Sequence, residues 1–164
     1  MGEAVKTILI LCTGHPYYCD KGFGFHVAKF FERIQLSENI EVIEVGESGS
    51  LITHIMEGKD KMIVVDVFQT KDKPGTILRL KPQEVPVTVD GVTDVAKYHL
   101  METLEQLSLI GKCPETLFIG VVPKDIESIN SQLTPEIENK IPEVINLILE
   151  EIDEEASKHH TPIK

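Results

Sequence analysis

Four short runs of the chain are almost continuously apolar and rich in β-branched residues. They are TILILCT (7–13), IEVIEV (40–45), KMIVVDVF (61–68) and ETLFIGVV (115–122). A strand carries apolar residues on both faces when both sides of its sheet are covered, which is typical of parallel sheets. We therefore predict core strands at residues 7–13, 40–45, 61–67 and 115–122. A fifth run, GTILRL (75–80), has the alternation of a half-exposed edge strand.

Stretches with a helical repeat separate these runs. One predicted apolar face consists of Phe23, Val27, Phe30, Phe31 and Ile34, and another of Val95, Tyr98, Met101, Leu104 and Leu107. A short helix is expected over residues 50–58. A last helix begins after Thr134, with a kink expected at Pro142, and residues 153–164 are expected to fray.

Strands and helices alternate along the chain, and this order predicts a doubly wound α/β fold with helices on both faces of a mostly parallel sheet. The length of 164 residues suits a single domain that spans residues 1–164.

The charge of the chain limits its partners. It has 27 acidic and 16 basic residues, a net charge of -11, so nucleic acids and anionic membranes are repelled. No apolar stretch approaches the roughly 20 residues that span a bilayer. The three cysteines show no C-x-x-C spacing. This pattern favours reduced thiols and a cytoplasmic location over a disulfide framework or a zinc site.

Right-handed crossovers bring the loops that follow the strands to one edge of the sheet, and a site is expected there. Four segments converge on this edge: CTGHPYYCDKGFG (12–24), GESGS (46–50), Asp66 and VVPKD (121–125). Asp66 closes an apolar strand, so its carboxylate needs a partner or a ligand. The alternative is that Asp66 caps a loop by accepting backbone amides.

The other polar residues of these segments also have two interpretations. Asp20 is either a site residue or the cap of the helix that begins near Gly22, and His15 is either a ligand or a turn residue. His26 and His54 are expected to be surface or core residues, and Cys19 and Cys113 inert thiols. The GESGS loop is too loose for a phosphate site, and Glu47 would repel phosphate.

The chain resembles the hydrogenase maturation endopeptidases over about 150 residues. The matching segments, in family order, are ILILCTGHPYYCDKGFGFHV, EVGESG, MIVVDVF, KPGTILRL, HLMETL, FIGVVPKDIE and LTPEIENKIPEVINLIL. The resemblance implies an enzyme that removes a C-terminal extension from the large subunit of a nickel–iron hydrogenase after nickel has been inserted. The large subunit is then the partner, and its nickel is sensed or bound.

The resemblance also implies metal-contacting positions. They are an acid in the first loop, the aspartate that ends the third strand, and a histidine at the head of a later helix. The second corresponds here to Asp66 and the third to His99, while the first falls at Lys21, so the preceding Asp20 is taken as the acid of that loop, with Asp20 and Asp66 as the catalytic pair. Aligning the later helix by its leucines instead puts the histidine position at Ala96. Carboxylate and imidazole ligands suit nickel or zinc.

The first turn departs from the family pattern. Lys21 stands where the ligand acid is usual, His15 replaces an asparagine, and Cys12 and Val45 replace glycines. A protonated ammonium cannot coordinate a metal. Two interpretations follow: an active peptidase whose missing ligand is Asp20 or His15, or a non-catalytic relative that binds a hydrogenase-like subunit without cleaving it. We expect Lys21 either to pair with Asp66 or Asp20, or to point into solvent.

Overall fold

The computed structural model describes residues 5–46 and 52–158, and its centre is a five-stranded sheet of order β2-β1-β3-β7-β4. β1 (Ile8–Thr13), β2 (Ile40–Gly46), β3 (Lys61–Val67) and β7 (Glu115–Val121) are parallel. β4 (Ile77–Leu80) pairs antiparallel with β7 at the edge. The predicted strands and the α/β fold are confirmed, but the prediction of a core strand at 40–45 was wrong: β2 lies at the other edge of the sheet and none of its residues is buried.

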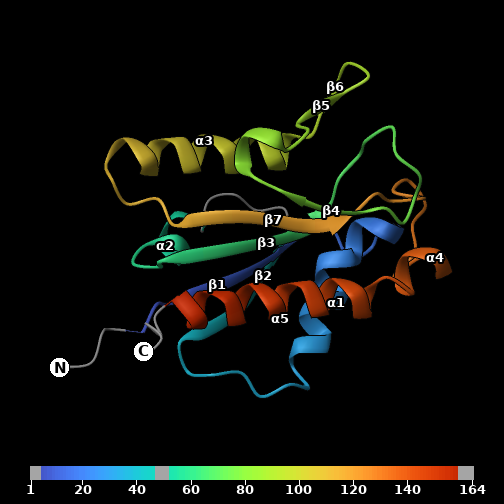
Figure 1. Cartoon of the computed structure of the whole chain (residues 1–164). Helices are drawn as coiled ribbons and strands as arrows, with labels where there is room; N and C mark the ends of the chain where they lie inside the picture. Colours follow the sequence, from blue (N-terminus) through green and yellow to red (C-terminus); the bar gives the residue numbers. More distant parts are fainter. Residues whose placement is uncertain (1–4, 47–51, 159–164) are drawn as a thin grey trace.

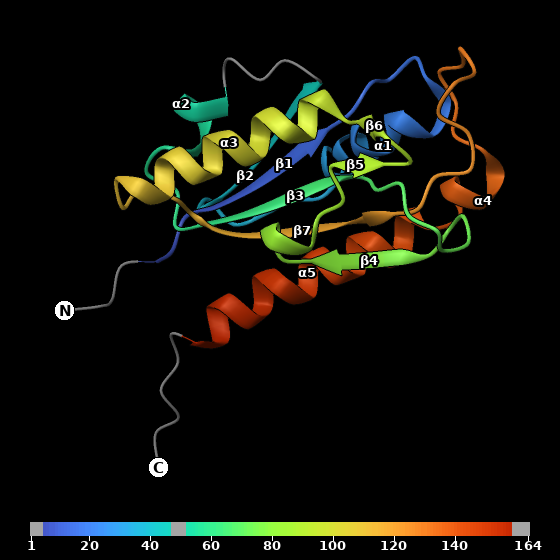
Figure 2. The ribbon, with the colours of Figure 1, turned by 90° about the horizontal axis from the view of Figure 1, so that it is seen from above.

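Helices cover both faces of this sheet (Figure 1). α1 (Phe23–Phe31), α4 (Pro135–Glu138) and α5 (Ile141–Lys158) pack on one face, and α2 (Ile52–Met56) and α3 (Val95–Leu109) on the other. Figure 2 looks onto the α3 side and shows β4 at the sheet's edge. Successive residues of β1 point alternately to the two faces, so both sides of the strand are buried and both need apolar residues.

The helix faces differ from the prediction in two places. Phe30 is 37% exposed, and α1 ends at Phe31. The buried residues of α3 are Lys97, Leu100, Leu104 and Leu107, whereas Val95 and Tyr98 are exposed. The predicted face was wrong at the start of α3 because it excluded a lysine, which is seldom buried without a charged partner.

The C-terminal region also differs. α4 and α5 are separate helices, and Pro142 is the second residue of α5 rather than a kink. A proline in the first turn removes no helical hydrogen bond, since the first amides have no partner in the helix. The predicted fraying is wrong for residues 153–158: α5 continues to Lys158, and Glu155 is buried against the sheet. Residues 159–164 lie outside the described part of the chain.

A small hairpin, absent from the prediction, stands at the carboxyl edge of the sheet (Figure 1). It consists of β5 (Thr88–Val89) and β6 (Val92–Thr93). Asp90 and Gly91 form its turn with φ of +51° and +76°. An Asp-Gly pair between two short β-branched stretches is the sequence signal for this turn. In the described ranges, no helix has both the length and the apolar character of a bilayer span.

Gly24 lets α1 approach the sheet closely, next to the turn that carries the first site segment. A Cβ there would collide with the Thr13 carbonyl oxygen and lie 2.9 Å from that of Val65. In Gly24→Ala, the gain in helix propensity of about 1 kcal/mol is outweighed by this overpacking, which costs about 1–3 kcal/mol and forces a backbone shift.

We therefore expect Gly24→Ala to lower the free energy of unfolding, measured by urea denaturation. The control is Lys29→Ala on the exposed side of the same helix, where Lys29 Nζ lies 3.5 Å from Glu32 Oε1 and 5.3 Å from the centre of the Phe25 ring. A Gly24→Ala protein as stable as the wild type would show that α1 is not held against β1 and β3 at this point.

Candidate functional site

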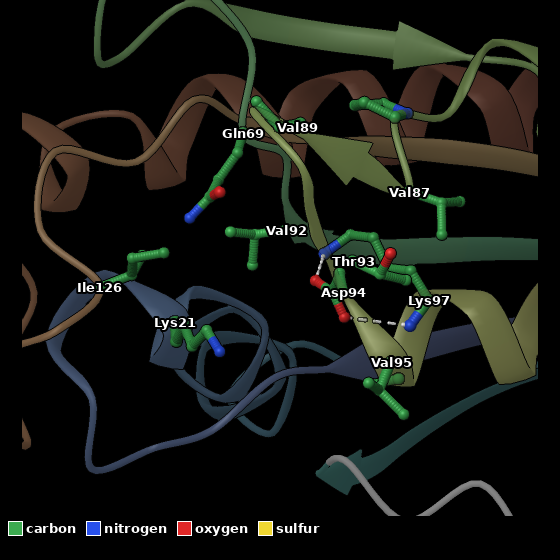
Figure 3. A pocket seen from close by; sticks show the side chains of 12 residues that line it. Lys21, Gln69, Val87, Val89, Val92, Thr93, Asp94, Val95, Lys97 and Ile126 are labelled. Atoms are coloured by element: carbon green, nitrogen blue, oxygen red, sulfur yellow. Dashed lines mark hydrogen bonds and ion pairs between the residues drawn. The ribbon is translucent and has the colours of Figure 1, made fainter.

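A cleft of about 320 Å³ lies at the carboxyl edge of the sheet. Its walls come from the turn that holds Lys21, the β5–β6 hairpin, the first turn of α3 and the loop that holds Ile126 (Figure 3). We call it the hairpin cleft. A recess of about 20 Å³ shares Lys21, Asp94 and Lys97 with the cleft and reaches Asp66.

Asp66 is held firmly at the end of β3. Its neighbours Met62 and Val64 pack in the core beneath α3, and strand alternation places Asp66 on the same side. Thr13 Oγ1 donates a hydrogen bond of 2.7 Å to Oδ2, and the Val67 amide donates one of 2.7 Å to Oδ1. The residue is 8% exposed. A buried carboxylate of this kind needs a positive partner.

The positive partner of Asp66 is Lys97, in the first turn of α3. Its Nζ lies 3.4 Å from Asp66 Oδ2 and 2.8 Å from Asp94 Oδ2, and 5.4 Å from the centre of the Phe68 ring. Burial alone would lower the pKa of Lys97, but the carboxylates of Asp66 and Asp94 outweigh it and raise that pKa above its usual range. Lys97 is therefore a charged ammonium.

Asp94 completes this cluster. It is the N-cap of α3, and its Oδ1 accepts the Lys97 amide at 3.1 Å. Burial raises the pKa of Asp94, but the charge and hydrogen bonds of Lys97, together with the charge of Lys21, bring it below its usual value. Lys21 thus acts on Asp94 from the opposite wall of the cleft (Figure 3). Lys21 is half-buried on the wall of the cleft, and Asp94 was not among the partners expected for it.

Asp20 is buried in the loop structure beside the cleft and does not line it. Its Oδ2 accepts the amides of Lys124 and Asp125, both at 2.9 Å. Its Oδ1 accepts the amide of Thr134 at 2.8 Å, and the Thr134 hydroxyl lies within 3.0 Å of both oxygens. Asp20 is a cap, as one interpretation held, but for the loop and helix start at 124–134 rather than for α1.

His99 and His15 also lie outside the lining of the cleft. The His99 side chain is 57% exposed and its Nδ1 lies 3.4 Å from Glu102 Oε2. His15 accepts the Tyr17 amide at Nδ1 over 3.2 Å, within its own turn. Ala96 does line the recess with Asp66, which agrees with the alternative alignment of this helix. The structure therefore does not bring Asp20, Asp66 and His99 together.

The other histidines and cysteines considered in the sequence have the following surroundings. His26 Nε2 lies 3.1 Å from the Ser131 carbonyl oxygen, His54 is exposed, and Cys19 is buried. Burial, followed by the charges of Glu44 and Asp66, raises the pKa of the Cys12 thiol far above its usual value, so it stays protonated. The GESGS loop beyond Gly46 lies outside the described residues.

Sequence reasoning missed Lys97 and Asp94, although a signal for both was present. Lys97, Leu100, Leu104 and Leu107 follow the helical spacing of one face. A lysine at the head of such a face requires a buried carboxylate, and Asp66 was already recognised as a carboxylate that requires a partner. Asp94 stands three residues before Lys97, in the N-cap position of the helix.

The residues of the cleft do not fit a nickel or zinc ion. Such ions take three or more ligands from imidazole, thiolate and carboxylate groups. The cleft and its recess offer the carboxylates of Asp94 and Asp66, both paired with Lys97. No histidine or cysteine of the described residues lines either of them. Within residues 5–46 and 52–158, no group of three His, Cys, Asp or Glu side chains is placed to hold a metal ion.

Comparisons with known proteins agree on one family. The sequence model of the hydrogenase maturation proteases matches residues 25–151. A putative hydrogenase maturation protease of Methanocaldococcus jannaschii is 33% identical over 151 residues, covering 90% of this chain and 97% of that protein. The hydrogenase expression/formation protein HupD of Bradyrhizobium diazoefficiens is 28% identical over 163 residues, covering 95% of this chain and 84% of HupD.

The structural comparison gives the same result. The hydrogenase maturating endopeptidase HybD of E. coli superposes with a TM-score of 0.83 and 26% sequence identity, and the match covers 90% of this chain and 93% of that one. The similarity therefore extends over nine-tenths of the chain rather than over one motif.

Proposed function

Because the chain belongs to the hydrogenase maturation protease family, we propose that it is the endopeptidase that removes the C-terminal extension of a nickel–iron hydrogenase large subunit. The observation that carries this proposal is the position of Asp66. Asp66 is the last residue but one of β3, and it lines the recess that adjoins the hairpin cleft. A site at the carboxyl ends of parallel strands is where ligands bind in open α/β sheets.

The hairpin cleft suits an extended peptide segment. Val87, Val89, Val92 and Val95 contribute apolar lining, while Lys21, Gln69 and Asp94 contribute polar groups. An extended segment buries its apolar side chains against such a wall and pairs its backbone with the polar groups. In this proposal the partner is the large subunit, and nickel arrives with it as part of the substrate.

Asp66 is the residue that we assign to the chemistry. A water molecule in the recess gives a proton to the carboxylate as its oxygen bonds to the peptide carbonyl carbon. The Lys21 ammonium, on the wall of the same recess, stabilises the negative charge that forms on the carbonyl oxygen. The carbon–nitrogen bond then breaks, and the proton passes from Asp66 to the leaving nitrogen. Water is the only co-reactant.

We also propose that the protein works in the cytoplasm. Cys12, Cys19 and Cys113 are all free thiols, as expected in a reducing compartment. A fractionation of cells that express a tagged full-length chain tests the location separately from the activity.

Precursor processing tests the proposed function. Purified large subunit that still carries its extension is incubated with the protein, and its intact mass is measured over time. We expect the wild type to release the extension and Asp66→Asn to process at least 100-fold more slowly, since a general base contributes about 10²–10⁴ in rate. The control is Asp153→Asn on α5, an exposed carboxylate far along the chain from the cleft, which should process at the wild-type rate.

A second function, binding of the large subunit without cleavage, is favoured by one observation. Oδ2 of Asp66 is engaged by both Thr13 and Lys97, and Oδ1 by the Val67 amide, which restricts the carboxylate as a base. A precursor that binds the wild-type protein but never loses its extension would establish this second function. A precursor that neither binds nor changes mass would contradict both.

A further inference from the structure

Lys97 holds the position beside Asp66 where a bound cation would have to sit. Its ammonium touches the Oδ2 atoms of Asp66 and Asp94, at 3.4 Å and 2.8 Å. Its side chain is 8% exposed, and it lies over the face of the buried Phe68 ring. We propose that Lys97 is a built-in cation that replaces a metal ion in this site, so that the cleft works without coordinating a metal.

The ammonium and a metal ion exclude each other here. A divalent ion bound to Asp66 Oδ2 would share that oxygen with the positive charge of Lys97 only 3.4 Å away, and the repulsion is strong where solvent is scarce. Lys97 cannot swing away at low cost, because its stem is packed in the first turn of α3 and its charge would lose both carboxylates.

The other residues of the site also disfavour a bound metal ion. Lys21 brings a second ammonium to the recess, and Ala96 offers no donor atom. Asp20 is occupied with amides of the 124–134 loop. Among the residues that the structure describes, Asp66 and Asp94 together balance Lys97 and Lys21, so this part of the site is neutral without an added ion. A site rich in carboxylates would instead need an external cation.

The inference deepens the proposed function, because it rests on this cleft being the site where the large subunit is processed. It also limits which features of the substrate the cleft can recognise. Asp66 and its neighbours would recognise the peptide and the shape of the subunit, and not the nickel by direct ligation. Metal binding by the isolated protein can be measured without any substrate, so the two proposals can fail separately.

The experiment is a calorimetric titration of the full-length protein with Ni²⁺ and with Zn²⁺, in the wild type and in Asp66→Asn. We expect the two proteins to give the same heats, because no ion binds at Asp66. Any binding that persists in Asp66→Asn does not depend on Asp66 and agrees with the proposal. One equivalent of either ion bound by the wild type and lost in Asp66→Asn would overturn it.

Removing the built-in cation gives the opposite test. Lys97→Met keeps the apolar stem but leaves two facing carboxylates, so we expect a melting temperature several degrees below that of the wild type. Ni²⁺ or Zn²⁺ should restore part of the loss, and the double variant Lys97→Met/Asp66→Asn should not respond to either ion. The control is Lys112→Met, whose side chain is 60% exposed and 3.9 Å from Glu57.

Two outcomes of this second test contradict the proposal: Lys97→Met that melts like the wild type, or one that melts lower and is not stabilised by either ion. If Lys97→Met does not fold, the titration of the wild type against Asp66→Asn still decides, since Asp66→Asn leaves the pair of Lys97 with Asp94 intact.

Discussion

Replacing Asp20 by alanine is expected to cost about 3 kcal/mol or more of the free energy of unfolding. The carboxylate is fully buried and accepts the amides of Lys124, Asp125 and Thr134 and the hydroxyl of Thr134. Alanine leaves these donors without their acceptor, and each unsatisfied buried donor costs about 1–3 kcal/mol. Since domains are stable by only about 5–15 kcal/mol, urea denaturation will show the loss clearly.

Asp20→Asn separates the capping role from the charge. The amide keeps the shape and one acceptor oxygen but turns an NH2 group toward backbone amides, so an intermediate loss is expected. Asp153→Ala, an exposed position on α5, is the control and should change stability by no more than about 0.5 kcal/mol. An Asp20→Ala protein that keeps wild-type stability but loses processing would instead make Asp20 a functional residue, as the sequence pattern suggested.

Lys61→Met is expected to destabilise the protein by about 3–5 kcal/mol, the usual cost of breaking a buried ion pair on one side. Lys61 begins β3 and is 3% exposed. Its Nζ lies 3.1 Å from Glu151 Oε2 and 3.0 Å from Glu155 Oε1, which ties the end of α5 to the sheet. The variant leaves two buried carboxylates without the ammonium that lies between them, although Arg79 still pairs with Glu151 and Lys6 with Glu155.

Lys59→Met is the matched control for Lys61→Met, two residues earlier in the chain. Lys59 Nζ lies 2.7 Å from Glu41 Oε2, but the Glu41 side chain is 51% exposed, and an exposed pair contributes about 0–1 kcal/mol. Neutralising the carboxylates in Lys61→Met/Glu151→Gln/Glu155→Gln should recover part of the loss. Equal effects of Lys61→Met and Lys59→Met on the urea midpoint would contradict a special role for the buried cluster.

The candidate site was predictable only in part. Asp66 was found because an acid that closes an apolar strand must have a partner, and strand order places its end at the functional edge. Lys97 was missed because the predicted apolar face of this helix began at Val95, which is exposed, whereas the buried face of α3 begins at Lys97. His99 was predicted from its imidazole and from its place in the family order. It lies two residues after Lys97 in α3, so its side chain projects from another face of the helix and is exposed.

Local patterns in the sequence determined the positions of the strands and the α/β order, because these depend on side-chain periods of two and 3.6 residues along the chain. Only the tertiary structure decided which groups meet. Asp20 joins the loop at 124–134 across more than 100 residues, and Lys97 of α3 meets Asp66 of β3. Such contacts depend on how helices and strands pack against one another. Local periodicity carries no information about which distant elements come close in space.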